Sequence, residues 1–449
     1  MSILIKNGII VTMNPRRDVF SGDLLIEDDR IVQIGKTVDA NADLTLNASG
    51  KLVIPGLIQT HVHLCQALFR GMADDLELLD WLSKRIWPLE AAHDEDSLYY
   101  SSLLACAELL RGGTTSVIDM ATVHHSTSVF EAVKLAGIRY LGGKCLMDLG
   151  DQVPKGLIET SDLAIQESLD LMNTWQGCEQ GRIRYAFCPR FAVSCSHRLL
   201  KDIQILSTKH KIPVHTHASE SLGEIALIEK DRGMPNILYL DSLGLCNENL
   251  ILAHCVHINR EELKTLAKSQ TRIAHCPSGN LKLASGIAPV PQLMEAGARV
   301  SLGADGAPCN NNLNMFMEMR LAALIHKPHN GPTAMPADQV FAMATLEGAK
   351  AIGQENEIGS LEVGKKADVV VVSLDAWHSR PLNAASVYSH LVYQAQASDV
   401  HTTIVDGRIV LQDGRLLSIS EHEVKEKSEH ALLRVCKRAG IQPAFSPPV

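Results

Sequence analysis

The sequence has few of the features that mark membrane, secreted or nucleic-acid-binding proteins. No apolar run approaches the roughly 20 residues that a membrane helix needs. The first residues alternate and turn, unlike a secretion signal. Lysine and arginine form no cluster, and the formal net charge is −9, which argues against nucleic acid as a partner. We therefore expect a small-molecule substrate, with no nucleic acid and no membrane among the partners.

The cysteines also lack a pattern. There are eleven, an odd number, and no two form a CxxC pair. Cys188, Cys255 and Cys276 lie inside apolar, strand-like runs, where cysteine usually behaves as a small hydrophobe. This usage predicts reduced cysteines and a cytoplasmic protein.

The sequence does contain short strand-like runs at both ends. The length of 449 residues is enough for one large domain with a smaller one attached. Short apolar runs separated by turn residues occupy 3–5, 8–13, 23–27, 30–34 and 44–47, and again 367–374, 401–407 and 408–414. We interpret residues 1–54 and 360–420 as one small β-sandwich domain built from both termini; two independent β-flaps are the alternative. Residues 421–449 are expected to form a C-terminal helix and tail.

The middle of the chain, residues 55–359, alternates short apolar strands with amphipathic segments. The expected strands are 51–58, 115–120, 139–148, 182–188, 211–217, 250–255, 271–276 and 299–305. Eight strands, each followed by a helix, are typical of a closed α/β fold, the (β/α)8 or TIM-like barrel. A doubly wound open sheet fits less well, because no glycine-rich phosphate turn follows the first strand.

Histidines and one aspartate stand where these strands end, which is where barrels of this kind place their active sites. The first strand runs into His61 and His63, whose side chains point to the same side because alternate strand residues do. The later strands end at His215, His217, His254, His275 and Asp305. Neutral nitrogens and one carboxylate suit Zn²⁺ or a similar divalent ion. His215 and His275 have an alternative role as barrel filling or as hydrogen-bond partners of the ligands.

With these motifs in place, the chain resembles the amidohydrolase superfamily over almost its full length. The resemblance lies in the two halves of the β-domain and in PGLIQTHVHL, HTHASE, LAHCVH, AHCPSGNLKLASGIAPVP and LGADGAPCNNNLNMF. Within the superfamily it is most similar to the aminohydrolase branch. That branch contains deaminases of 5'-deoxyadenosine, methylthioadenosine and S-adenosylhomocysteine, guanine deaminase and the chlorotriazine hydrolases.

The resemblance implies a role for each residue of the site. The matching metal ligands are His61, His63, His217 and Asp305. They imply one divalent ion, with Zn²⁺ expected and Fe²⁺ or Mn²⁺ as alternatives. Glu220 matches the proton-shuttling acid, His254 matches the histidine that positions the hydrolytic water, and Asp305 is also expected to move a proton. Some chlorohydrolases of the branch lack the equivalent of Glu220 or of Asp305, so their presence together favours deamination.

The loop after the first strand is expected to contact the substrate. It contains Gln66 and Glu90, and in nucleoside-deaminating members an acid in a stretch like RIWPLEAAH contacts the ribose hydroxyls. A solvated or helix-capping acid is the alternative for Glu90. Trp81 and Trp87 of the same loop are expected to pack in the core or the loop.

Further contacts are expected after the third, fourth and seventh strands. Arg190 in CPRFAVSCS stands where methylthioadenosine and S-adenosylhomocysteine deaminases commonly carry histidine, and it resembles the arginine that guanine deaminases direct at the purine carbonyl. Lys144 lies near the position of an arginine in S-adenosylhomocysteine deaminases. Ser278 and Asn280 are candidates for ring or sugar contacts, or else cap the next turn.

Together these features predict a metal-dependent enzyme that deaminates an adenosine derivative such as 5'-deoxyadenosine, 5'-methylthioadenosine or S-adenosylhomocysteine. A guanine, pterin or triazine aminohydrolase is the alternative enzyme. A non-catalytic barrel is the alternative of another class, and the intact set of site residues argues against it. Because family members are usually oligomers, a homo-oligomer is expected.

Overall fold

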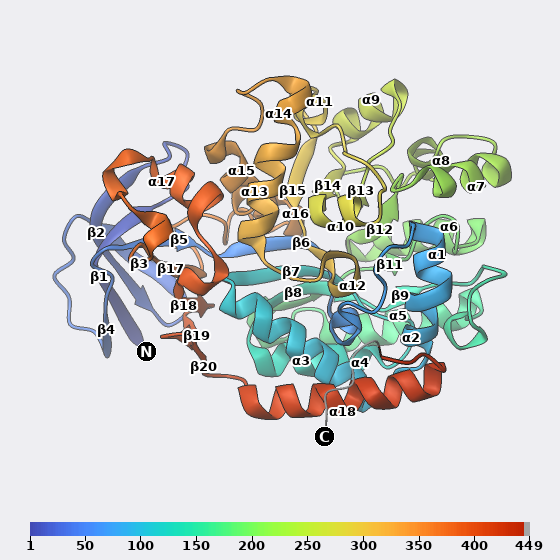
Figure 1. The fold of residues 1–449 in the computed structure, drawn as a ribbon, viewed down its shortest axis with the longest axis horizontal. Helices are drawn as coiled ribbons and strands as arrows, with labels where there is room; N and C mark the ends of the chain where they lie inside the picture. The colour runs from blue at the N-terminus through green and yellow to red at the C-terminus, as the bar shows by residue number, and fades with distance from the viewer. Residues whose placement is uncertain (444–449) are drawn as a thin grey trace.

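A computed structural model describes residues 1–443 and shows a barrel with a β-sheet on one side of it (Figure 1). The sheet lies on the left of the view and the barrel with its helices on the right. The last residues of the expected tail, 444–449, lie outside the described residues.

Strands from both ends of the chain form the sheet. Its order is β20-β19-β18-β17-β5-β1-β2-β3, with β4 beside β1. The strands are β1 (Ser2–Val11), β2 (Val19–Glu27), β3 (Arg30–Gly35), β4 (Leu44–Asn47), β5 (Lys51–Pro55), β17 (Val369–Ser373), β18 (Val400–Val405), β19 (Arg408–Gln412) and β20 (Arg415–Leu416). The two ends meet where β5 pairs antiparallel with β17, with Val53 opposite Val371. One continuous nine-stranded sheet results.

Parallel strands form the barrel. They are β6 (Leu57–His63), β7 (Thr114–Met120), β8 (Arg139–Gly143), β9 (Cys145–Leu146), β10 (Ile183–Tyr185), β11 (Cys188–Pro189), β12 (Val214–Ala218), β13 (Leu250–His254), β14 (Arg272–His275), β15 (Arg299–Leu302) and β16 (Asp305–Gly306). A parallel bridge between Phe187, which lies between β10 and β11, and Val214 connects this part of the chain to β12, and pairing of Asp305 with Val62 joins β16 to β6. These two junctions close the ring of a (β/α)8 barrel.

The first predicted strand, 51–58, is in fact two strands. Pro55 ends β5, which belongs to the terminal sheet, and β6 begins at Leu57 in the barrel. Gly56 makes the crossing between them, since a Cβ there would lie 2.0 Å from Thr115 Oγ1. The apolar run is continuous in the sequence because both strands are buried, so the break could not be seen from hydrophobicity.

Helices cover the outside of the barrel. They are α1 (Leu78–Trp81), α2 (Trp87–Ala91), α3 (Glu95–Arg111), α4 (Ser126–Ala136), α5 (Ser161–Trp175), α6 (His197–His210), α7 (Leu222–Arg232), α8 (Asn236–Ser242), α9 (Arg260–Ser269), α10 (Pro277–Lys282), α11 (Val290–Glu295), α12 (Ala307–Asn310), α13 (Met315–Ile325), α14 (Lys327–Asn330), α15 (Ala337–Met343), α16 (Leu346–Ile352), α17 (Val387–Ser389) and α18 (Glu421–Ala439). The 3-10 helix η1 (Leu64–Phe69) and the π-helix η2 (Leu82–Ile86) lie in the loop after β6. Helix α18 crosses the lower edge of the barrel against α3 (Figure 1). Within residues 1–443 no helix is long and apolar enough to cross a membrane.

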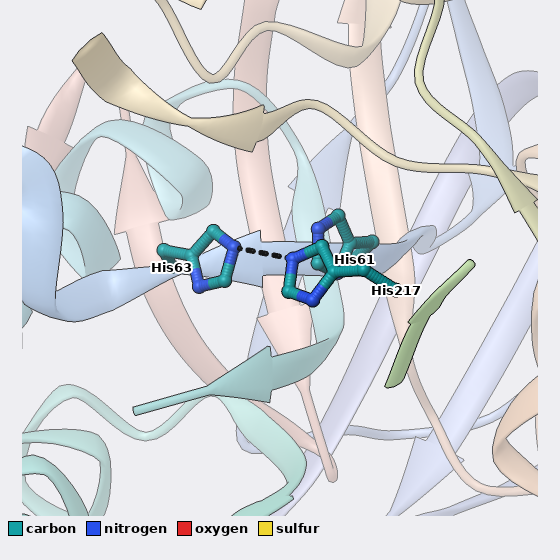
Figure 2. A group of neighbouring side chains, drawn as sticks. All are labelled: His61, His63 and His217. Atoms are coloured by element: carbon teal, nitrogen blue, oxygen red, sulfur yellow. Dashed lines mark hydrogen bonds between the residues drawn. The ribbon is translucent and has the colours of Figure 1, made fainter. Parts of the chain in front are cut away.

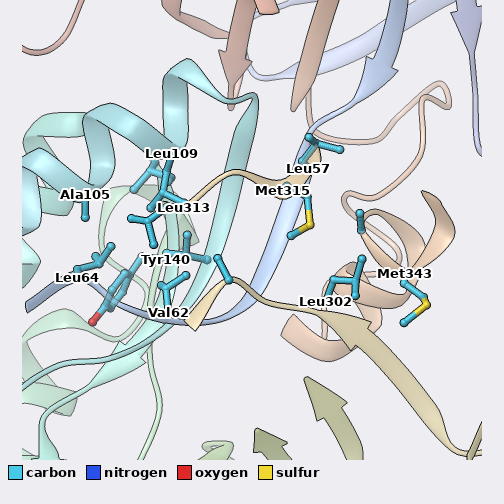
Figure 3. Packing of buried hydrophobic residues seen from close by; sticks show 14 of the residues in the cluster. Leu57, Val62, Leu64, Ala105, Leu109, Tyr140, Leu302, Leu313, Met315 and Met343 are labelled. Atoms are coloured by element: carbon cyan, nitrogen blue, oxygen red, sulfur yellow. The ribbon is translucent and has the colours of Figure 1, made fainter. Parts of the chain in front are cut away.

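Apolar side chains fill the space between the strands and the helices. Leu57 and Val62 of β6, Leu109 of α3 and Met315 of α13 are fully buried in one cluster (Figure 3). Burying each side chain of this size stabilises the fold by about 1.5–3 kcal/mol. The core therefore fixes β6, the strand that bears the first two histidines of the site.

A buried arginine connects the barrel to the terminal sheet. Arg139, at the start of β8, donates two hydrogen bonds to Asp368 at 2.8 and 2.9 Å and a third to Asp406 at 3.0 Å. Its side chain is 2% exposed. The hydrogen bonds between the guanidinium and the two carboxylates offset the free-energy cost of removing these charges from water.

Replacing Arg139 with methionine should therefore lower the free energy of unfolding by about 3–5 kcal/mol, because the buried carboxylate of Asp368 loses its cation. Urea denaturation would measure this. The matched control is Arg16→Met, whose side chain is 82% exposed beside Asp18 and whose loss should leave stability unchanged. Equal stability of the Arg139 variant and the control would contradict the argument.

Candidate metal centre and active site

Histidines and an aspartate from separate strands converge at the carboxyl ends of the barrel strands. His61 and His63 lie on β6, His217 on β12 and Asp305 at the start of β16. Asp305 Oδ1 lies 3.3 Å from His61 Nε2 and 3.4 Å from His63 Nε2. The Nε2 atoms of His63 and His217 are 3.2 Å apart (Figure 2). The structure thus brings together the four residues that the sequence predicts as metal ligands.

The tautomers of His63 and His217 can be read from their partners. His63 Nδ1 lies 2.9 Å from the Met120 carbonyl, and His217 Nδ1 lies 2.6 Å from the Arg190 carbonyl. A carbonyl only accepts, so each Nδ1 bears the hydrogen. Burial lowers the pKa of His63 to about 4 and that of His217 well below its usual value, which keeps both rings neutral. Their Nε2 lone pairs therefore face each other at 3.2 Å, an arrangement that needs a cation between them.

Hydrogen-bond partners also assign the tautomer of His61 and give His215 a role. His215 Nδ1 lies 3.3 Å from the Ile251 carbonyl, so its Nε2 accepts the hydrogen of His61 Nδ1 at 2.8 Å. His61 Nε2 is left with a lone pair and no hydrogen-bond partner among residues 1–443. His215 is therefore a residue that orients a ligand, as partners behind metal-binding histidines commonly are.

These atoms fit a divalent ion. Tetrahedral ligands at about 2.0–2.1 Å from Zn²⁺ are roughly 3.3–3.4 Å from one another, close to the spacings in the structure. Burial would raise the pKa of Asp305, but the imidazoles around the carboxylate, His61 first among them, hold the pKa well below its usual value. Three neutral nitrogens and one carboxylate thus form the donor set.

Glu220 and His254 lie beside the ligands. His254 Nε2 is 3.4 Å from Glu220 Oε2 and 4.0 Å from Asp305 Oδ2. Glu220 Oε1 and His254 Nε2 are buried and lack a hydrogen-bond partner within the described part of the chain. Burial, then the negative charge of Asp305, raises the pKa of Glu220 well above its usual value. A protonated acid and an oriented imidazole are therefore available to a bound molecule.

The backbone is bent to aim these groups. His254 and Asp305 have φ angles of 77° and 65°, in the left-handed region that residues other than glycine rarely adopt. Gly279 follows β14 and approaches Asp305 so closely that a Cβ would lie 2.9 Å from Oδ2. Strained residues concentrate at functional sites, and these occur at two of the reacting groups.

A small pocket opens over the site. Beside the polar site residues, its walls are Leu78, Trp81, Leu82, Arg190, Phe191 and Leu283. Trp81, expected from the sequence only to pack, lines this pocket as well. Sequence reasoning missed the apolar wall, because nothing in the sequence distinguishes a pocket leucine from a core leucine.

The structure corrects the expected roles of Glu90 and Gln66. Arg190 donates from Nη1 to Glu90 Oε2 at 2.6 Å and from Nη2 to Oε1 at 3.3 Å, and Gln66 Nε2 donates to Oε1 at 2.7 Å. Glu90 is 3% exposed and is not among the pocket walls, whereas Arg190 is. Glu90 is therefore engaged inside the protein instead of being open to ribose hydroxyls, and the pocket meets the guanidinium.

Lys144 lies elsewhere, so the prediction that it contacts substrate is wrong in this structure. Its side chain is fully buried, and Nζ donates to both oxygens of Glu159 at 2.8 Å and to Glu167. It lines a separate cavity with His125 and Trp175. Two acids distant in sequence hold it away from the metal site.

Ser278 and Asn280 take supporting positions. Ser278 Oγ donates to Glu318 Oε1 at 2.6 Å, and Asn280 Oδ1 accepts from His254 Nδ1 at 2.8 Å. Neither side chain is among the pocket walls, and the expected ring or sugar contacts stay a prediction. His275 fills the barrel next to His326, with a ring separation of 5.5 Å.

Sequence reasoning also missed Glu224. Its carboxylate accepts the backbone N–H of Glu220 at 2.7 Å and of Ser219 at 3.2 Å, which fixes the turn that presents Glu220. The signal was present, because Ser221 and Glu224 have the S-x-x-E spacing of a helix capping box.

A three-histidine, one-aspartate metal site at the carboxyl ends of a (β/α)8 barrel, with an acid beside it, defines a metal-dependent hydrolase of the barrel class. The model of the Amidohydrolase family matches residues 52–410, and the chain belongs to that family.

Relatives match nearly the whole chain. A 5'-deoxyadenosine deaminase of Methanosarcina acetivorans is 39% identical over 439 residues, which is 97% of this chain and 99% of the relative. A 5-methylthioadenosine/S-adenosylhomocysteine deaminase of Thermococcus onnurineus is 38% identical over 93% of this chain and 95% of its own length. The solved structure of a zinc-bound adenosine deaminase from Xanthomonas campestris superposes with a TM-score of 0.91 at 31% identity, covering 97% of this chain and 98% of that one.

Removal of His215 should weaken the metal site without touching a ligand atom. We expect His215→Leu to lower Zn²⁺ affinity about 10–100-fold, because His61 loses the partner that fixes its tautomer. Titration of the metal-free protein with Zn²⁺ against a competing chelator would measure the affinity. His422→Ala, whose side chain is 92% exposed, is the control. Unchanged affinity in His215→Leu would refute the tautomer assignment.

Proposed function

We propose that the chain is a hydrolytic deaminase that releases ammonia from an adenosine derivative of the 5'-deoxyadenosine, 5'-methylthioadenosine or S-adenosylhomocysteine type, with Zn²⁺ as its resident ion. The observation that best supports this is that Glu220 Oε1 and His254 Nε2 are buried beside the set of ligands without a hydrogen-bond partner in residues 1–443. A non-catalytic barrel would have no reason to bury these two polar atoms without partners. The deaminase relatives support the same reaction class.

When bound, a divalent ion supplies Lewis acidity and lowers the pKa of water towards ~7. The protein's own groups handle the protons. Glu220, protonated because its pKa is raised, donates its proton to the ring nitrogen next to the reacting carbon as water attacks that carbon. Asp305 accepts a proton from the attacking water and transfers it to the departing amine. A carbon–oxygen bond replaces the carbon–nitrogen bond and ammonia leaves, while the second proton of the water returns to Glu220 as the new hydroxyl becomes a ring carbonyl.

His254 and the apolar walls prepare this step. Asn280 fixes the ring of His254, so that Nε2 can align the attacking water near Asp305. Trp81, Phe191 and Leu283 offer apolar surface for a flat heterocycle and exclude bulk water.

Arg190 supports a second candidate function. Its guanidinium lines the pocket and presents hydrogen-bond donors there, while the acid expected to bind the ribose is engaged by it. Donors suit a ring carbonyl, as in guanine or a pterin. An aminohydrolase for such a ring, or for a triazine, is therefore the alternative within the same chemistry.

We also infer that the chain works in the cytoplasm, because all eleven cysteines are free. The homo-oligomer expected from the family resemblance stays a prediction.

Glu220→Gln should retain the metal and lose about 10²–10⁴-fold in kcat, because only proton transfer is removed. In the wild type the acid must be protonated, so kcat should hold at low pH and fall as the pH rises through the raised pKa of Glu220. The variant should lack this alkaline decline. Ammonia release and bound zinc are measured together. The control is Glu262→Gln, a buried acid that caps α9 away from the site. Full activity in Glu220→Gln would place the proton donor elsewhere.

A panel of substrates tests which heterocyclic ring the enzyme deaminates. Ammonia release is compared for 5'-deoxyadenosine, 5'-methylthioadenosine, S-adenosylhomocysteine, guanine, pterin and melamine at equal enzyme concentration. We expect the highest kcat/KM for an adenosine derivative. A higher value for guanine or pterin would favour the second candidate, and no ammonia from any compound would overturn the deaminase proposal.

A further inference from the structure

Glu318 of α13 is a buried carboxylate that joins two turns of the active site. Its side chain is fully buried, and its hydrogen-bond partners in the described part of the chain are neutral donors. Oε1 accepts from Ser278 Oγ at 2.6 Å and from Asn310 Nδ2 at 2.9 Å, and Oε2 accepts from the Ser278 backbone N–H at 3.2 Å. A buried acid without a cation costs stability, so stability alone does not account for it.

The first turn positions His254. Ser278 lies in the first turn of α10, directly before Gly279 and Asn280. Asn280 Oδ1 accepts from His254 Nδ1 at 2.8 Å, and Gly279 comes so close to Asp305 that a Cβ would lie 2.9 Å from Oδ2. A shift of Ser278 would therefore move the partner of His254 and the neighbour of Asp305 together.

The second turn positions Asp305. Asn310, the last residue of α12, donates from Nδ2 to Glu318 and also, at 2.7 Å, to the carbonyl of Ala304. Ala304 directly precedes Asp305, whose backbone is in the left-handed region. Asn310 thus connects Glu318 to the strained bend that aims the Asp305 carboxylate.

We propose that Glu318 is a positioning residue for the reaction: it fixes the placement of His254 relative to Asp305 by holding Ser278 and Asn310. The proposal rests on the proposed function, because the two positioned groups are those assigned to water and proton handling. Glu318 is not among the pocket walls, so it acts through its partners. An amide cannot replace it, because one of its two ends donates and would face a donor of Ser278 or Asn310.

This role predicts a separation of kcat from KM. Misplacement of reacting groups by about 1 Å can reduce turnover about 10²-fold. The apolar walls that bind the ring do not contact Glu318, and the ligand histidines have their own partners on β7, β12 and the Arg190 carbonyl. Turnover should therefore fall while substrate binding and metal binding persist.

The test is Glu318→Gln in the full-length, zinc-loaded protein, with the best substrate of the panel. We expect kcat to fall about 10–100-fold, KM to change less than threefold and zinc to remain at the wild-type amount. The matched control is Glu262→Gln, because Glu262 is also a buried acid that accepts backbone N–H groups, at Ile237 and Asn259, but on an outer helix. Its kcat should equal that of the wild type.

Two further measurements keep the test decisive. If Glu318→Gln does not fold, Ser278→Ala removes one of the three donors and should lower kcat about 3–10-fold at constant KM. The ¹⁵N signals of the His254 ring, assigned by their loss in His254→Ala, should shift in Glu318→Gln and not in Glu262→Gln. Wild-type kcat in both site variants, loss of activity only in proportion to lost zinc, or unshifted His254 signals would overturn the proposal. An inactive wild type would contradict the proposed function instead, and the His254 signals would then decide this inference alone.

Discussion

The convergence of buried ligand atoms on one point is the constraint on which this active site depends. The carbonyls of Met120 and Arg190 keep the hydrogens of His63 and His217 on Nδ1. The two Nε2 atoms therefore lie 3.2 Å apart with a lone pair on each and no hydrogen between them. Such a contact is tolerable in a buried place only if a positive charge occupies it or the surrounding fold enforces it. The packed core behind β6 holds His61 and His63 in place, and the ionised Asp305 completes a set of ligands suited to a cation.

Closure of the barrel is the geometric condition for that arrangement. Asp305 reaches the histidines because β16 pairs with β6, with Asp305 opposite Val62, although the two strands lie at opposite ends of the barrel sequence. The terminal sheet continues directly into β6 through Gly56, and Arg139 of β8 ties a second barrel strand to the same sheet. The small sheet thereby supports the strand on which the metal site begins.

The sequence allowed the barrel and the metal set to be predicted, because strand periodicity places His61 and His63 on one side and strand ends collect His217 and Asp305. It could not reveal pairings between distant charges. Glu90 and Arg190 are 100 positions apart, and each was plausible as a substrate contact until the structure paired them. Lys144 was misjudged for the same reason, since its partner Glu159 lies in a loop whose path no local pattern specifies.

The Glu90–Arg190 pair has a consequence for how such a pocket changes its chemistry over evolution. Arg190 lines the pocket, whereas Glu90 lies behind it. The pocket wall therefore presents the N–H donors of the guanidinium, and the carboxylate that could accept hydrogen bonds is covered by them. Substitution of this single arginine by a shorter residue would invert the polarity of the wall from donor to acceptor without altering the metal, the acid or the barrel. In this chain a single side chain therefore decides whether the pocket wall offers hydrogen-bond donors or an acceptor.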